Sequence, residues 1–132
     1  MKTEYDISTK EKEISYLDIV DDILYTQLGL KPANGGTKYL RDLIIYIYNK
    51  NEYDYIIDKE LKMFIKEKNI KKNPKTIKSK MVYAINNSRR EKIEKNFYYV
   101  FKTDYDSYYL SIKNVVNASI IILKNANLKN TN

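Results

Sequence analysis

Five lysines surround one Asn-Pro dipeptide, at positions Lys71, Lys72, Lys75, Lys78 and Lys80. Asn73-Pro74 is a strong signal for a helix start, with asparagine as the N-cap and proline as the first helical residue. The free N–H groups and positive dipole end of a helix start favour contact with a phosphate, and the lysines add charge. These residue types at this spacing predict contact with a polyanion, above all duplex DNA. The alternative is that the lysines form an ordinary solvated face.

Positive charge is concentrated in one part of the chain. Residues 61–102 contain 13 Lys/Arg against 3 Asp/Glu. Residues 1–60 contain 8 against 12, and residues 103–132 contain 3 against 2. The 132 residues together carry a formal net charge of +7. This segregation favours a nucleic-acid partner more strongly than a basic pI alone would.

Several other kinds of chemistry lack the residues they need. The sequence contains no Cys and no His, which removes disulfides, thiolate nucleophiles, imidazole bases and the usual zinc sites. No nucleophile has an adjacent base, so we expect no enzymatic activity, no cofactor, no metal and no small-molecule ligand. We expect Asp18, Asp21 and Asp22 to compensate a helix dipole rather than bind a metal. Gly35-Gly36 is expected to form a tight connection rather than a phosphate cradle.

Membrane insertion and secretion are not expected. No apolar run is long enough to span a bilayer, and the start of the chain lacks the apolar core of a secretion signal. The sequence therefore predicts a cytoplasmic, nucleoid-associated protein with no membrane partner.

Apolar residues recur at helical spacing through most of the chain. In the first predicted helix they are Tyr16, Ile19, Val20, Ile23, Leu24 and Leu28. Gly29 and Pro32 end that helix. In the second predicted helix they are Leu40, Leu43, Ile44 and Ile47. Thr37 is its expected N-cap, and residues 49–51 are its expected end.

Further helices are predicted over residues 58–68, 74–88 and 107–124, with helical spacing also at Ile93, Phe97, Val100 and Phe101. Their inward positions are Leu61, Phe64 and Ile65, then Ile77, Met81, Ala84 and Ile85, then Tyr109, Ile112, Val116, Ile120 and Leu123. Ile70 is expected to anchor the turn before Pro74. The prediction is an all-α, compact multi-helix domain of about six helices over residues 16–124, containing a helix-turn-helix. A flexible arm (1–15) and a frayed tail (125–132) flank it.

Two blocks resemble the C-terminal DNA-binding effector domain of the sporulation master response regulator family (stage zero sporulation protein A). One is LGLKPANGGTKYLRDLI at residues 28–44, where Tyr39-Leu40-Arg41 is the most specific match. The other is LKMFIKEKNIKKNPKTIKSKMVYAI at residues 61–85, in the same apolar register. Residues 97–123 match loosely in length and apolar spacing. The resemblance implies an all-α DNA-binding domain with a helix-turn-helix, and paired DNA sites on which a homodimer forms.

The chain departs from this family at the recognition positions. Thr76 and Ser79 stand where the family has two arginines, and Lys78 stands where it has an acid. Arginine reads guanine with a fork of donors, whereas lysine is a point charge, so we expect a different operator. The family's receiver domain has no counterpart before residue 16, so regulation by phosphorelay is not expected.

Candidate roles follow from the helix start and the resemblance together. Base edges are assigned to Lys75, Thr76, Lys78, Ser79 and Val82, the last against a thymine methyl. Phosphates are assigned to Lys71, Lys72, Lys80, Arg89 and Arg90. Arg41 is a further candidate residue, but it also has a purely structural alternative, which is an ion pair with a carboxylate that fixes its helix in place. Asn86 is expected to face solvent rather than an adenine.

The leading hypothesis is a stand-alone duplex-DNA-binding protein, a transcriptional regulator that reads the major groove with the helix starting at Pro74. The alternative is a protein-interaction module, an adaptor or antagonist of a regulator, that has kept the scaffold but lost operator binding. A weaker option is single-stranded nucleic-acid binding through Tyr98-Tyr99 and Tyr108-Tyr109. Packing of these tyrosines against amphipathic segments is the favoured interpretation.

Overall fold

The computed structural model describes residues 16–51, 54–88 and 111–131. Every regular element in these ranges is a helix, as predicted, and the ranges contain no β-strand. They hold five helices, where the sequence predicts about six. Three predicted features lie outside the described residues: the helical spacing between Ile93 and Phe101, the arm 1–15 and the two tyrosine pairs.

The first helix changes its hydrogen-bond pattern partway along. Residues 16–21 are α-helical, and the π-helix η2 (Asp22–Gln27) follows. A bond of 2.9 Å from the Leu28 N–H to the Ile23 carbonyl closes the wide turn. The prediction of one α-helix to Leu28 was therefore wrong in its second half. Leu24 and Leu28 are both fully buried, and Gly29 ends the helix at φ 75°, as predicted.

The central helix α2 (Gly35–Lys50) begins earlier than predicted. Its N-cap is Asn34, whose Oδ1 accepts a 2.9 Å hydrogen bond from the Gly36 N–H. The assignment of Thr37 as N-cap was wrong, because Thr37 lies inside the helix and is buried. The C-cap Asn51 has left-handed backbone geometry, φ 53°, which confirms the predicted end. The predicted inward residues are all buried: Leu40, Leu43, Ile44 and Ile47.

Gly36 lets the start of α2 touch the backbone of α4 (Pro74–Asn86). A Cβ atom at Gly36 would lie 1.9 Å from the Lys80 carbonyl oxygen and 2.4 Å from its carbon. A Cβ at the neighbouring Gly35 would meet nothing within 4 Å. The two glycines are thus the first residues of a helix, and one of them is a packing residue. This contact fixes the position along α4 at which the start of α2 packs.

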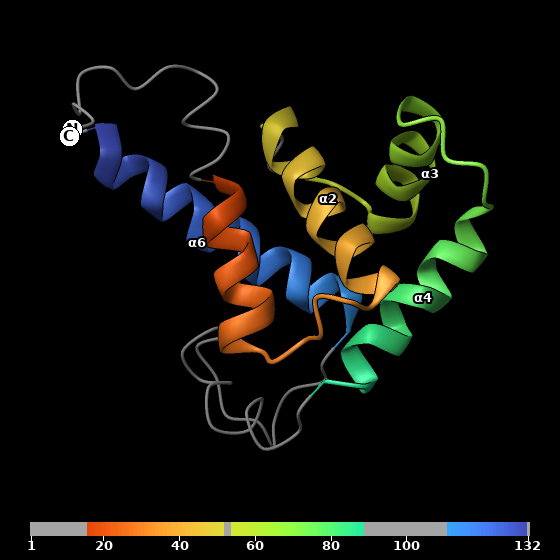
Figure 1. Cartoon of the computed structure of the whole chain (residues 1–132). Coiled ribbons are helices and arrows are strands. Elements are labelled where there is room, and N and C mark those ends of the chain that lie inside the picture. The colour runs from red at the N-terminus through yellow and green to blue at the C-terminus, as the bar shows by residue number, and fades with distance from the viewer. Residues whose placement is uncertain (1–15, 52–53, 89–110, 132) are drawn as a thin grey trace, which may run out of the picture.

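Helix α3 (Ile57–Glu67) lies above α4 in Figure 1, and the turn that joins them is at the right-hand edge of the molecule. The turn contains Asn69 at φ 54°, and the Ile70 N–H bonds the Ile65 carbonyl at 3.0 Å. Ile70 is half-buried against the core rather than fully buried. Asn73 Oδ1 accepts the Thr76 N–H at 2.8 Å, which confirms the predicted Asn-Pro helix start.

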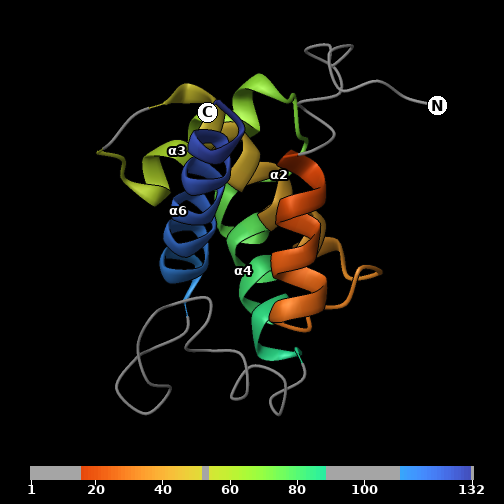
Figure 2. The same cartoon turned by 90° about the vertical axis from the view of Figure 1, so that its left-hand side faces the viewer.

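Helix α6 (Ile112–Thr131) packs against α2 and α4 (Figure 2). It begins after the predicted residue 107, and it continues past residue 124 into the segment predicted to fray. Its buried residues include the predicted Ile112, Val116, Ile120 and Leu123. A hydrogen bond from the Tyr55 hydroxyl to Asn117 Oδ1 ties the segment before α3 to α6. The core therefore forms where α2 is surrounded by the other helices.

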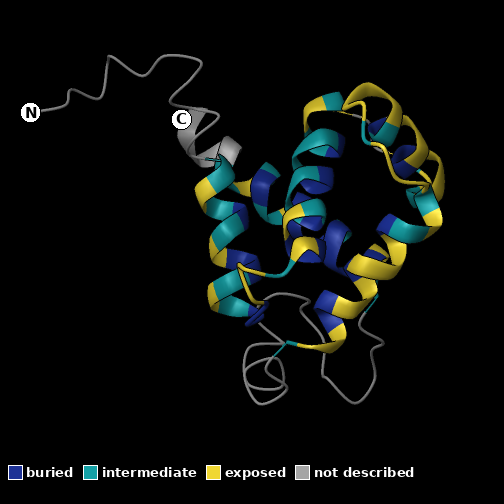
Figure 3. Ribbon diagram, turned by 45° about the vertical axis from the view of Figure 1, so that its right-hand side comes forward, coloured by how far each residue is buried: buried dark blue, intermediate teal, exposed yellow. Residues whose placement is uncertain are grey.

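Buried residues of α3 and α4 turn toward α2, and exposed residues line the outer side of both helices (Figure 3). Helix α4 buries the four predicted positions Ile77, Met81, Ala84 and Ile85. Leu61 and Phe64 of α3 are also buried, whereas Ile65 is only half-buried. This one-sided burial leaves the opposite side of α4 open to solvent.

Candidate nucleic-acid interface

One exposed row of side chains runs along α4. Lys75, Ser79, Val82 and Asn86 are spaced at i, i+4, i+7 and i+11, so they share one helix face, and all four are exposed. We call these four residues the outer stripe. Val82 keeps 41% of its surface exposed although it is apolar. The amino end of α4 is capped by its own Asn73 and lies at the surface.

The edge of α4 that faces α3 carries an ion pair. Lys78 Nζ lies 3.0 Å from Asp58 Oδ1, in the first turn of α3. Both side chains are largely exposed, so the pair contributes little to folding stability. It does set the charge of this edge, because the ammonium group already has a counterion.

The opposite edge of α4 faces the start of α2. A groove of about 660 Å³ opens there, lined by Asn34, Gly35, Gly36, Lys75, Thr76, Ser79, Lys80 and Tyr83. Thr76 is half-buried at this edge, and Lys80 is exposed. Tyr83 is 62% exposed. This groove combines two lysines, three hydroxyl-bearing residues and the amino end of a second helix, α2.

The turn between α3 and α4 carries the remaining described lysines of the predicted site. Lys71 and Lys72 are exposed, and Lys71 Nζ contacts Asn69 Oδ1 at 3.3 Å. The sequence from residue 68 to residue 90 contains no Asp or Glu. Arg89 and Arg90, the other predicted phosphate contacts, lie outside the described residues. The structure therefore brings the described candidates to one side of the molecule, around α4.

A mainly apolar groove flanks α4 on the side of α3 and α6. It measures about 480 Å³ and is lined by Tyr55, Ile56, Ile57, Asp58, Lys78, Val82, Ile85, Asn86, Ser111, Ile112 and Lys113. Ile56 is 68% exposed at its rim. Ile56 and Val82 are both exposed apolar residues that line this groove, and we call these two residues the apolar strip.

Arg41 does not belong to this face. Its Nε lies 3.3 Å from Asp42 Oδ1, and its Nη1 lies 3.6 Å from Asp21 Oδ1 on the first helix. Burial disfavours the charged guanidinium, but the charges of Asp42, Tyr25 and Asp21 outweigh it and raise the pKa of Arg41. These contacts support the structural alternative, an ion pair that fixes α2 against the first helix.

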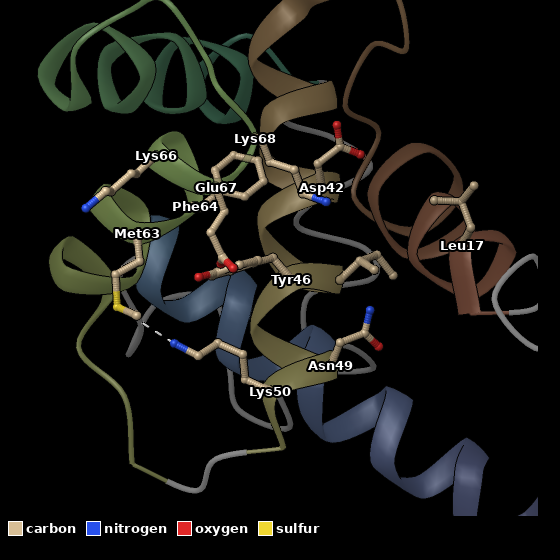
Figure 4. A pocket seen from close by; sticks show the side chains of 11 residues that line it. Leu17, Asp42, Tyr46, Asn49, Lys50, Met63, Phe64, Lys66, Glu67 and Lys68 are labelled. Carbon is tan, nitrogen blue, oxygen red and sulfur yellow. Dashed lines mark hydrogen bonds between the residues drawn. The ribbon is translucent and has the colours of Figure 1, made fainter.

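A cavity of about 910 Å³ lies away from α4, between the first helix, α2 and α3 (Figure 4). Lys50 reaches across it toward Met63 Sδ at 3.8 Å and pairs with the buried Glu60 at 2.7 Å. Burial of Tyr46, with Glu67 nearby, raises the pKa of its hydroxyl to about 12. No residue of α4 lines this cavity. It is therefore separate from the outer stripe and from the two grooves beside α4.

Metal binding and membrane insertion gain no support from the described part of the chain. It contains no group of three or more acidic side chains that could hold a metal ion. None of its helices combines the length and the apolar character that crossing a bilayer requires. The sequence matches no protein-family model, and neither the curated proteins nor the solved structures that were compared give a match.

Two contributors to the α4 surface were missed by reasoning from the sequence. Tyr83 follows Lys75 and Ser79 at steps of four, so helical spacing alone could have placed it on the outer side. The start of α2 was missed because nothing in the sequence indicates that Gly36 touches Lys80.

Proposed function

We propose that this protein binds duplex DNA, with α3, the turn and α4 acting as a helix-turn-helix. In such a motif the first helix crosses the phosphate backbone, and the second places its amino-terminal side chains in the major groove. The observation that carries the proposal is the exposed amino end of α4, with lysines around it and the outer stripe running from it. The fully buried opposite face supports α4 rigidly from behind.

The arrangement refines the proposed roles of individual residues. Lys75, Ser79 and Val82 lie on the outer stripe and are the proposed contacts to base edges. Thr76 and Lys78 lie at the two edges of α4. In these positions they fit contacts to the sugar-phosphate sides of the DNA major groove better than contacts to the base edges. Lys71, Lys72 and Lys80 are proposed to contact phosphates, which position the protein without specifying sequence. Arg89 and Arg90 keep that proposed role on sequence grounds alone.

The resemblance to the sporulation-regulator effector domain supports the same proposal. On this proposal, the chain shares that scaffold but reads a different operator, because Thr76 and Ser79 replace the family's recognition arginines. It acts as a transcriptional regulator at the nucleoid, and it binds paired sites as a homodimer.

The salt dependence of duplex binding tests the proposal. The affinity for a short mixed-sequence duplex is expected to fall with salt at a log–log slope of about −0.9 per phosphate neutralised. Lys71→Ala and Lys72→Ala should each weaken all duplexes alike and reduce the slope by about 1. Fluorescence anisotropy over a salt series measures both quantities.

Lys124→Ala is the matched control, because Lys124 lies on α6, outside the proposed helix-turn-helix, and lines neither groove beside α4. It removes the same charge and should leave the slope unchanged. A flat salt dependence in the wild-type protein, or an equal loss in Lys124→Ala, would contradict the proposal.

A protein-interaction module is the second candidate. The apolar groove with the exposed Ile56 at its rim favours it, as does the replacement of the family's arginines. This candidate predicts no duplex binding even at low salt, so the same anisotropy series separates the two functions.

A further inference from the structure

The carboxyl-terminal half of the outer stripe carries Val82 and Asn86, and neither suits a G·C pair. We infer that this half of α4 reads A·T base pairs, with Val82 against a thymine methyl and Asn86 against an adenine. The inference rests on the proposed function and deepens it by naming the bases. Val82 is 41% exposed. Asn86, which the sequence predicts to face solvent rather than an adenine, is exposed on the same face four residues later, and this shared face is the reason to assign it to a base instead.

The chemistry of the major groove supports this assignment. Only thymine offers a methyl group there, and apolar side chains contact it. The adenine edge presents an acceptor and a donor that match the two polar groups of an asparagine amide. Four helical residues advance about 6 Å along the axis, which is roughly two steps of 3.4 Å in the duplex. Val82 and Asn86 can therefore address base pairs close together in one site.

Within α4, residues 81–86 lack the groups that read G·C pairs in the major groove. Guanine is read by an arginine or lysine and cytosine by a carboxylate, and α4 contains no Arg, Asp or Glu. The carboxylate of Asp58 at the edge of α4 is bound to Lys78. Lys75 can address guanine, but it stands at the other end of the stripe, about 10 Å from Val82 along the axis.

Replacing thymine by uracil removes one methyl group and nothing else, so it tests the Val82 contact directly. Wild-type protein should bind an alternating A·T duplex about three- to fourfold more tightly than its uracil counterpart, as expected for one buried methyl. Val82→Ala should bind the two duplexes equally. Ile121→Ala is the control, because Ile121 is an exposed apolar residue of α6 (59%), and it should retain the difference.

The Asn86 contact is tested by comparing A·T with G·C duplexes of equal length. The ratio of A·T to G·C affinity should be about tenfold smaller in Asn86→Ala than in the wild type. This factor is in the lower range expected for the loss of one bidentate contact. Asn49→Ala, which changes an exposed asparagine of α2 in the cavity that no α4 residue lines, should retain the wild-type ratio.

The possible failures are distinguishable. Salt-dependent binding with equal affinity for thymine and uracil duplexes would overturn the inference and leave the proposed function standing. No duplex binding at low salt would overturn both. Self-association that Val82→Ala abolishes, without any thymine effect, would reassign the apolar strip to a contact between protein copies and overturn the inference.

Discussion

Thr37 places a hydroxyl group in the protein interior. Its side chain is fully buried, and its Oγ1 has no hydrogen-bond partner among the described residues. A buried hydroxyl without a partner costs about 1–3 kcal/mol. Replacing it with a methyl group of similar size removes that cost and keeps the packing.

Thr37→Val is therefore expected to raise the free energy of unfolding by about 1 kcal/mol, measured by urea denaturation. Thr37→Ala serves as the comparison, because it removes the hydroxyl and the methyl together and leaves a small void. A Thr37→Val protein no more stable than the wild type would show that the hydroxyl is satisfied.

For single residues, the sequence predicts those contacts that join residues close together in the chain. Asn73 and Pro74 start a helix because the capping bond joins residues three apart. The ion pair of Lys78 joins residues twenty positions apart, and no local pattern indicates it. The sequence therefore predicts that Lys78 contacts base edges, although the ion pair holds it at an edge of α4.

Among the helices, the crossing of α2 over α4 depends on a single missing side chain. The Cβ of any other residue at Gly36 would collide with the Lys80 backbone, which cannot move aside as a side chain could. Gly36→Ala is expected to lower the free energy of unfolding by at least about 3 kcal/mol. The measurement is urea denaturation followed by circular dichroism.

Gly35→Ala is the matched control for this substitution. Its Cβ would meet open space, so the change should be neutral or stabilising by up to about 1 kcal/mol. Equal destabilisation by both variants would refute the close crossing.

Helix faces were predictable from the sequence, but helix crossings were not. The inward residues of α2 and α4 follow from apolar spacing, because burial on one side imposes that spacing. The glycine pair at positions 35–36 predicts a turn, since glycine usually disfavours helix interiors. Its actual role depends on a residue of α4 that is far away in the sequence.

The stability of the whole molecule should fall at alkaline pH. Burial raises the pKa of Tyr46 to about 12, and burial together with a hydrogen bond to Tyr16 does the same for Tyr48. An unfolded tyrosine ionises near 10. Below that pH both states keep the proton, and the contribution to stability is complete. As pH rises from 10 through 12, the unfolded state loses its proton first, and stability is lost.

Tyr46→Phe should therefore lose less stability than the wild type between pH 8 and pH 11. The expected difference is about 1 kcal/mol, from 1.36 kcal/mol for each unit of pKa change and a discount for partial exposure. Urea midpoints at the two pH values measure it. An identical loss in both proteins would place the Tyr46 hydroxyl in contact with solvent.

For the molecule as a whole, the sequence predicts the all-α class and most helix bounds. The first helix departs from its prediction at Asp22–Gln27, a π-helix, because apolar residues four apart, such as Leu24 and Leu28, share one face of an ordinary α-helix as well and so do not reveal the wide turn. The candidate surface could be predicted as far as its lysines, which charge segregation reveals. Its two flanking grooves could not, since each combines residues from separate helices.

The pairing of Lys78 with Asp58 makes the two flanks of α4 unlike. A DNA strand that approaches over α3 meets a lysine, Lys78, that is already paired with a carboxylate, whereas one that approaches over the start of α2 meets Lys80 and the positive pole of a helix. On the proposed docking, this asymmetry gives the protein one preferred direction along its site. Whatever else the protein touches would then stand on a fixed side of the bound sequence, upstream or downstream.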